Sequence, residues 1–292
     1  MVTTPATSST ANARQHGLLA ELSALRAVVR REWTIFRRYP SWIIALFIWP
    51  VIFPMAYILS SQALAGPTSG GLQIFQRNAG TTDVVGYIVI GTIIWMWQNI
   101  VLWNVGFALR EEQLRGTLES SWMSPSWRFS LLLGNSVVQM LVMLIFIGVS
   151  LVEFTVFYGV RFNGDPLLVV LMFLLSIPSI YGLGFAFASV VITAREANAF
   201  VFLVRGLVMI FCGITYPIAV LPGWMQSVAQ FLPQTYIIYG FREAMLNGAS
   251  FQALLPVYQI LVVFGAFWLA VGFALFRRME RRARQTGALG QY

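Results

Sequence analysis

The sequence of 292 residues contains one cysteine, one histidine and no lysine. The single cysteine, Cys212, excludes an intrachain disulfide framework and a cysteine-rich metal site. The single histidine, His16, lies in a polar N-terminal segment, so the body of the chain has no histidine for a metal cluster or a catalytic dyad. We therefore expect no catalytic residue and no metal site in this chain.

Charged residues are scarce as well. Only 10% of the residues are charged and 58% are hydrophobic, a balance that a soluble domain of this size would not show. No segment reads GxxxxGK[ST], the loop that cradles nucleotide phosphates, so the chain is not expected to bind ATP in that way. The net charge of +8 does not indicate nucleic acid, because the arginines adjoin long apolar runs.

Those runs are long enough to cross a bilayer, which takes about 20 apolar residues. The sequence predicts an all-α membrane protein whose six transmembrane helices are approximately Ser41–Gln62, Val84–Leu109, Phe129–Tyr158, Leu167–Thr193, Ala197–Tyr216 and Ala253–Phe276. Pro50 and Pro54 predict a kink or break in the first helix. The Gly-, Ser- and Thr-rich segment Ala63–Asp83 should be an external connector.

The four predicted regions are a disordered tail at 1–17, an amphipathic interface helix at 18–39, the six-helix domain at 40–276 and a basic tail at 277–292. Small residues offer a close helix–helix surface, within or between subunits; they are Gly182, Gly184, Ala186, Ala188 and Ser189.

Arginine placement predicts the orientation. If the N-terminus is inside, most arginines fall in inner segments and the outer segments hold only Arg77, Arg161 and Arg242. By the positive-inside rule both termini are then cytoplasmic, in a multi-pass membrane protein.

One compact polar segment separates two spans, Leu109–Arg128, and it reads LREEQLRGTLESSWMSPSWR. Interpreted as one helix, it has a charged stripe at i, i+4 and i+8, formed by Glu111, Arg115 and Glu119. A separate apolar stripe comprises Leu114, Leu118 and Trp122. Such a helix lies along the membrane surface or docks onto a soluble partner. A solvated connector is the alternative.

Several residues of this segment resemble the cytoplasmic loop of ABC-2-type permeases, the membrane subunits of bacterial ABC exporters. They are Glu112, Gly116-Thr117-Leu118-Glu119 and Ser124-Pro125, followed by Leu131–Leu133 and Gly134. The resemblance extends from about Val29 to Phe276.

The resemblance implies that the loop carries a coupling helix which sits in a groove of the ATPase. The coupling residues would be Glu111, Glu112, Arg115, Gly116, Thr117, Glu119, Ser124 and Pro125. It also implies an extracellular re-entrant hairpin that closes the outer end of the pathway, with Tyr216, Pro217, Leu221, Pro222, Trp224 and Pro233. An interfacial hairpin that only anchors the fold is the alternative.

The implied partners are two copies of an ABC ATPase, which would hold ATP and Mg, and a second permease copy, identical or homologous. Membrane lipids are expected partners and nucleic acid is not. The helix at 18–39 would anchor the chain to the membrane or form a second contact with the ATPase.

Two charges fall inside predicted spans, where each costs on the order of 2.5–3.5 kcal/mol at a helix centre. Glu153 and Arg205 lie at different depths, so we do not expect them to pair. Each is a candidate for the transport pathway. The alternatives are that Arg205 reaches toward the inner surface and that Glu153 sits among outer headgroups.

The sequence thus predicts the permease subunit of an ATP-driven exporter for an amphiphilic or hydrophobic substrate, such as a drug, a glycolipid or a lipid-linked polysaccharide. An ATP-independent secondary transporter or channel is the main alternative, although it should carry more charges at mid-membrane. An integral-membrane enzyme would need a clustered acid–base or metal site.

Overall fold

A computed structural model of the chain describes residues 8–65, 70–123, 128–192 and 197–286. Every regular element in these ranges is helical. In chain order the elements are α1 Ser8–Arg38, α2 Pro40–Ala65, α3 Gly70–Ala79, α4 Val84–Asn104, α5 Ala108–Leu114, α6 Leu118–Met123, α7 Ser130–Tyr158, α8 Pro166–Val191, α9 Ala197–Phe211, the 3₁₀ turn η1 Ile218–Val220, α10 Gly223–Ala229, α11 Pro233–Met245 and α12 Phe251–Thr286.

Five helical segments of the described residues are long and apolar enough to cross a membrane. They are Pro40–Leu64, Val84–Leu114, Ser130–Tyr158, Pro166–Val191 and Phe251–Arg282. The fifth predicted span, Ala197–Tyr216, contains a helix of only 15 residues, α9. At 1.5 Å per residue this helix is about 22 Å long, shorter than the hydrocarbon core of about 30 Å. The chain is a multi-pass membrane protein, and a count of six spans is not confirmed.

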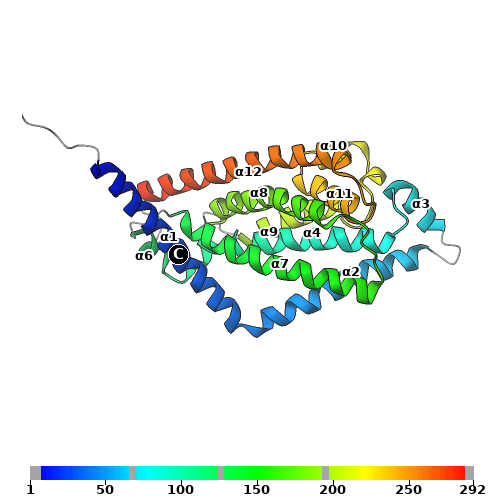
Figure 1. The fold of residues 1–292 in the computed structure, drawn as a ribbon, viewed down its shortest axis with the longest axis horizontal. Coiled ribbons are helices and arrows are strands. Elements are labelled where there is room, and N and C mark those ends of the chain that lie inside the picture. The colour runs from blue at the N-terminus through cyan, green and yellow to red at the C-terminus, as the bar shows by residue number, and fades with distance from the viewer. Residues whose placement is uncertain (1–7, 66–69, 124–127, 193–196, 287–292) are drawn as a thin grey trace, which may run out of the picture.

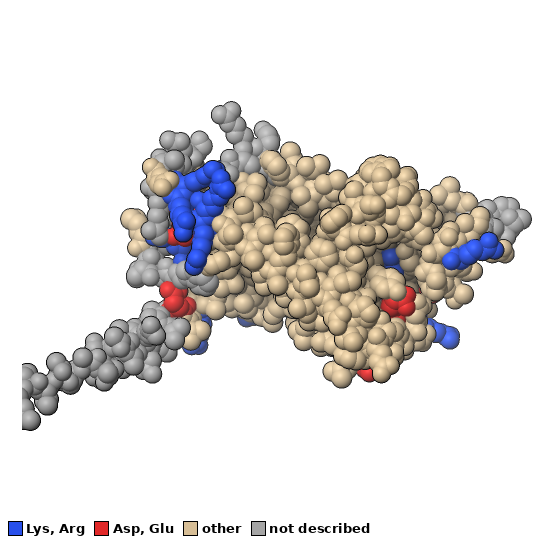
Figure 2. Space-filling view, turned by 90° about the horizontal axis from the view of Figure 1, so that it is seen from above, with Lys and Arg blue, Asp and Glu red and all other residues tan. Residues whose placement is uncertain are grey.

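The helices form an elongated bundle with two distinct ends (Figure 1). One end carries α1, α5, α6 and the C-terminal turns of α12, and we call it the arginine end. The opposite end carries α3, η1 and α10, and we call it the hairpin end. On the face seen in Figure 2 the charged residues gather toward the two ends and leave a broad uncharged middle. This distribution matches a bundle whose middle lies in hydrocarbon.

Helix α4 lies at the centre of the bundle, since most of its residues are buried. Its start is fixed by Asp83, whose Oδ1 accepts a hydrogen bond from the Gly86 amide at 2.7 Å. Helices α2, α7, α8, α9 and α11 all contact it. A helix that is buried on all sides carries apolar residues all round. This explains why the hydrophobic residues of α4 do not gather on one face.

Of the predicted kink or break at Pro50 and Pro54, the break is absent, because α2 continues through both prolines. The prolines nevertheless remove two backbone donors from the helix. The Tyr158 hydroxyl of α7 donates to the Val51 carbonyl in the same stretch. A side chain from a neighbouring helix therefore reaches the helix where its own bonding is weakest.

Three other boundaries differ from the sequence prediction. Helix α1 begins at Ser8, within the segment 1–17 that we expected to be disordered. The expected connector Ala63–Asp83 contains the amphipathic helix α3. Helix α12 continues to Thr286, so the first part of the basic tail is helical.

Helices α8 and α12 pack so closely that the backbone of one helix contacts the backbone of the other. A Cβ atom at Gly182 would lie 2.6 Å from the backbone nitrogen of Leu269. Gly184 instead faces α4, where a Cβ atom would lie 2.7 Å from a methyl group of Val101. At these two glycines, the small-residue surface joins helices within one subunit.

We expect Gly182→Ala to lower the melting temperature of the detergent-solubilised protein. The added methyl group meets backbone, so the helices must separate, at a cost of roughly 1–3 kcal/mol. Gly148→Ala in α7 is the matched control, because a Cβ atom there meets nothing within 4 Å. Size-exclusion chromatography after heating measures both. Equal melting temperatures would contradict the close packing of α8 and α12.

Candidate functional site

The polar loop at the arginine end is two short helices, α5 and α6, and the single helix predicted from Glu111 to Trp122 is wrong. The break falls at Gly116, which has a φ of +71°. Glycine adopts this left-handed conformation without the strain that a side chain would cause. The Gly116 amide donates to the Gln113 carbonyl at 3.0 Å, which closes α5. The loop therefore has a turn at its centre.

Glu112 faces into the protein and is 2% exposed. Its Oε1 pairs with Arg31 Nη2 of α1 at 2.8 Å, and its Oε2 accepts a hydrogen bond from the Thr117 hydroxyl at 2.6 Å. The Thr117 amide also donates to the Glu112 carbonyl at 3.0 Å. This carboxylate thus joins three segments, α1, α5 and the residue before α6.

Arg31 is the partner that the sequence did not reveal. Partial burial acts to lower the pKa of Arg31, but the hydrogen bonds and charges of Glu32 and Glu112 raise it overall. The apolar side of α1 packs on α7, where a Cβ atom at Gly134 would lie 2.5 Å from a methyl group of Val28. Helix α1 is therefore connected to the protein core and to the loop.

The solvent side of the loop presents both charge and apolar surface. Glu111 pairs with Arg115 at 3.0 Å, as the i, i+4 spacing predicted, and both side chains are 52% exposed. Leu114 is 65% exposed and Met123 is 81% exposed. Leu118 is 1% exposed, so it does not share a face with Leu114 as predicted. Exposed apolar side chains beside an ion pair can contact a protein partner.

The remaining predicted coupling residues are less fully described. Glu119 lies in α6, but its side chain is outside the described residues, as is that of Trp122. Ser124 and Pro125 lie wholly outside them. A second tie at this end joins Arg128 to Glu280 of α12.

The predicted hairpin residues lie at the boundaries of short elements at the hairpin end. Pro217 and Pro222 directly precede η1 and α10, Leu221 follows η1, and Pro233 begins α11. The Tyr216 hydroxyl donates to the Ile210 carbonyl at 2.5 Å. Trp224 is 64% exposed, with its ring edge-on to Phe211 at 6.1 Å between centroids. The prolines thus mark the starts of a 3₁₀ turn and two short helices, η1, α10 and α11.

Arg242 holds this segment in place. The sequence assigned it only to an outer segment and did not predict that its side chain would be buried and hydrogen-bonded. Its side chain is buried and donates to three backbone carbonyls, those of Tyr87, Gly213 and Ile214, at 2.7–3.1 Å. Its guanidinium carbon lies 3.2 Å from the centroid of the Tyr87 ring. Burial lowers the pKa of Arg242 to about 10, which leaves the group protonated at neutral pH.

The start of α11 is tied to α4 by a second contact. The Gln234 side chain donates to the Gln98 side-chain oxygen, and both residues are buried. Gln98 lies about 21 Å along α4 from its first residue, at 1.5 Å per residue. Tyr87, which contacts Arg242, lies near that first residue. Helix α11 therefore runs beside α4 from mid-bundle to the hairpin end.

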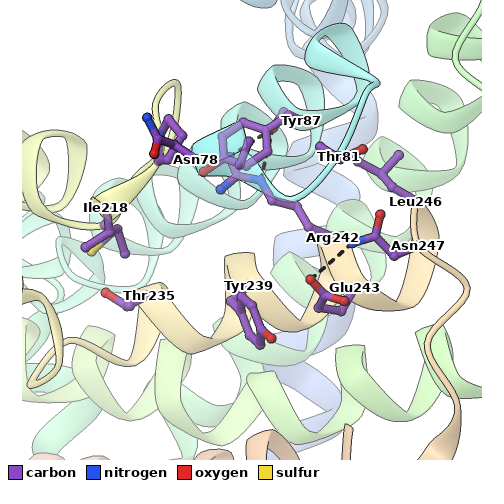
Figure 3. A pocket seen from close by; sticks show the side chains of 13 residues that line it. Asn78, Thr81, Tyr87, Ile218, Thr235, Tyr239, Arg242, Glu243, Leu246 and Asn247 are labelled. Atoms are coloured by element: carbon purple, nitrogen blue, oxygen red, sulfur yellow. Dashed lines mark hydrogen bonds between the residues drawn. The ribbon is translucent and has the colours of Figure 1, made fainter. Parts of the chain in front are cut away.

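A pocket of about 160 Å³ lies under the hairpin (Figure 3). Figure 3 shows Glu243 and Asn247 on its rim, joined by a hydrogen bond of 3.1 Å, and Arg242 directed toward Tyr87. An adjoining, more open pocket of about 500 Å³ shares Thr81, Leu246 and Asn247. The guanidinium of Arg242 forms part of the pocket wall. It already donates hydrogen bonds to three backbone carbonyls, so it has no pair of free N–H groups with which to bind a ligand.

The two charges of the bundle interior stay apart, as expected from their depths. Glu153 is half-buried on α7, and its Oε2 has no hydrogen-bond partner among the described residues. Arg205 lies on α9 with its guanidinium carbon 4.5 Å from the centroid of the Trp95 ring. No ion pair joins Glu153 to Arg205.

In the described part of the chain, no three His, Cys, Asp or Glu side chains are grouped closely enough to bind an ion. Of the predicted residues, the structure joins Glu112 to Thr117 and Glu111 to Arg115. Arg31 and Arg242 were missed. The signal for Arg242 was its position as the sole cation of the apolar segment 217–252.

Comparison with known proteins gives two matches. Residues 40–274 match the family model described as ABC-2 family transporter protein. The linearmycin resistance permease protein LnrN of Bacillus subtilis (strain 168) is 31% identical over 130 residues, which are 44% of this chain and 34% of the relative. The match therefore spans about a third of that relative's length.

Proposed function

The chain belongs to the ABC-2 family of transporter proteins, and we propose that it is the membrane subunit of an ATP-driven exporter in a bacterial inner membrane. Members of this family generally work with an ABC ATPase and often as dimers. The proposed assembly has two permease copies and two separate ATPase subunits, which bind ATP and Mg. One chain would supply half of the pathway.

The observation that carries the proposal is the loop at the arginine end. It presents exposed Leu114 and Met123 beside the Glu111–Arg115 pair, while Glu112 joins the same loop to α1. The loop is exposed to solvent on one side and bound to α1 on the other. Movement of a docked ATPase could therefore be transmitted through the loop to the bundle. ATP-driven closure would move α5 and α6 about the turn at Gly116 and so tilt the spans.

The orientation follows from charge. The arginine end carries the ends of α1 and α12 and the loop, so the positive-inside rule favours a cytoplasmic location for it and for both termini. The hairpin would then lie outside. The Gln98–Gln234 contact at mid-bundle supports a re-entrant hairpin that closes the outer end, because irregular backbone at that depth requires protein partners.

The substrate class is an amphiphilic or hydrophobic compound, such as a drug, a glycolipid or a lipid-linked polysaccharide. Similarity to a linearmycin resistance permease favours a toxic compound that is moved outward. Half-buried Glu153 on α7 and Arg205 on α9 are candidate pathway residues.

Purification of the tagged protein from its native membrane in mild detergent tests the proposal. We expect a Walker-motif ATPase to copurify in equal amount and the complex to hydrolyse ATP. Mass spectrometry and an ATPase assay measure both. Recovery of the protein without any ATPase would contradict the exporter and favour an ATP-independent transporter or channel.

A further inference from the structure

The guanidinium of Arg205 belongs to a half-buried side chain and has no acidic partner among the described residues. None of the ion pairs among the described residues includes it, and α9 carries no other charge between Asn198 and Phe211. A charge at the centre of a membrane helix costs on the order of 2.5–3.5 kcal/mol on the insertion scale. Unpaired charges of this kind face a cavity or pathway and mark the passage of substrates or ions.

The Arg205 side chain lies against the middle of a neighbouring helix, α4. It lies about 12 Å from the start of α9 at 1.5 Å per residue. Its guanidinium lies over the ring of Trp95, which occupies the middle of α4, and the Trp95 indole donates to the Arg205 carbonyl at 3.4 Å. The side chain is therefore held beside the middle of α4 by a cation–π contact.

Aromatic side chains of α2 complete the surroundings. Phe53 stacks on Trp95 with centroids 4.8 Å apart, and Tyr57 lies edge-on to Phe53 at 5.3 Å. The Tyr57 hydroxyl lies 4.0 Å from the sulfur of Met209 on α9. Three helices thus converge on one cation, and Arg205, Phe53, Tyr57 and Met209 all remain half-buried.

The chemistry of this arrangement selects a negative ligand. The guanidinium carbon lies over the Trp95 ring, and the guanidinium N–H groups make no hydrogen bond to any described residue, so they can bind a carboxylate or phosphate through two parallel bonds. The adjacent rings offer an apolar surface to the rest of the molecule. Phe202, about one turn before Arg205 on α9, is 58% exposed and adds apolar surface beside it.

We propose that Arg205, backed by Trp95 and flanked by Phe53 and Tyr57, binds the anionic group of an amphiphilic substrate during its passage. The substrate class is a carboxylate or phosphate carried on an apolar body. This inference rests on the proposed transport function and adds the charge of the cargo to it. The positive charge of Arg205 is complementary to the negative group of such a substrate, which is why we choose an anionic occupant.

Bromine quenching of tryptophan fluorescence tests the site in the full chain, with its copurifying partners, in phosphatidylcholine nanodiscs at pH 8. The probe is 11-bromoundecanoate and its neutral match is 11-bromoundecanol. We expect saturable quenching at an anion concentration about ten-fold lower than for the alcohol, as one charge-assisted contact provides. Arg205→Gln should remove the preference, and the control Arg161→Gln at the exposed hairpin end should keep it. An unchanged preference in Arg205→Gln would overturn the proposal.

A second measurement needs no variant, in case Arg205→Gln does not fold. Dodecyl phosphate should displace the bromoundecanoate from the wild-type protein, and dodecyltrimethylammonium should not. Equal displacement by both would overturn the proposal.

A resident lipid is a different outcome. If phosphatidylglycerol is retained by the wild type, is lost from Arg205→Gln and blocks the probe, the site holds a structural lipid and the assignment to substrate is wrong. Recovery of the chain without an ATPase would refute the exporter independently, because the quenching assay requires no ATP hydrolysis.

Discussion

Arg242→Met is expected to abolish the folded protein or to lower its melting temperature more than any other substitution proposed. The change removes the donors for three buried carbonyls, those of Tyr87, Gly213 and Ile214. Each unsatisfied buried group costs about 1–3 kcal/mol, and the total approaches the stability of about 5–15 kcal/mol that proteins typically have. Methionine fills a similar volume without a donor, so the lost hydrogen bonds dominate the effect.

The matched control is Arg77→Met, which removes an exposed arginine at the same end of the bundle. It should melt like the wild type, because surface charges contribute little to stability. Arg242→Lys should fall between the two, since one ammonium group cannot reach all three carbonyls. Chromatography of heated samples measures all of these variants. An Arg242→Met protein that melts within about 2 °C of the wild type would contradict the role of Arg242 in holding the hairpin segment in place.

Glu112→Ala is expected to uncouple ATP hydrolysis from transport while the protein stays folded. The change separates α1 from α5 by removing the Arg31 contact and the Thr117 hydrogen bond. Hydrogen bonds to charged groups contribute about 1.5–3 kcal/mol each, enough to loosen the loop without unfolding the bundle. We expect at least a ten-fold loss of substrate transport per ATP in the reconstituted complex, which follows from about 1.4 kcal/mol of lost contact energy.

Glu32→Ala is the matched control for this prediction. Glu32 also touches Arg31, at 2.6 Å, but it lies on α1 itself, so its loss leaves the link to α5 intact. Coupling should then be close to that of the wild type. Arg31→Ala should also lower coupling, because it removes the Arg31–Glu112 contact, and the double variant should be no worse than Glu112→Ala, which already lacks that contact. Similar coupling in Glu112→Ala and Glu32→Ala would exclude this link from the mechanism.

The long apolar helices were predictable because their length and hydropathy alone set them apart. The predicted third and fourth spans, Phe129–Tyr158 and Leu167–Thr193, agree with α7 and α8 to within two residues at each end. The fifth was overestimated because the apolar segment continues past Phe211 into non-helical backbone. Hydropathy shows that a segment is apolar, but it does not show at which residue the helix ends.

The loop shows a different limit. The i, i+4 spacing correctly paired Glu111 with Arg115, because the contact is local. The same periodicity extended a helix through Gly116, where the backbone instead turns with a φ of +71°. Arg31 and Glu112 are 81 positions apart, and Arg242 binds carbonyls 28 to 155 positions away. Contacts between distant segments cannot be read from the spacing of one chain.

Site-specific cross-linking tests the coupling loop most directly. The single native cysteine, Cys212, is buried, so Leu114→Cys introduces one accessible thiol for a maleimide–benzophenone label. Trp224→Cys at the hairpin end is the control, with similar exposure. We predict that illumination of the native complex joins the label at position 114 to the ATPase subunit and leaves the label at position 224 without such a product. An ATPase cross-link at position 224, or none at position 114, would contradict a loop that receives the push of ATP hydrolysis.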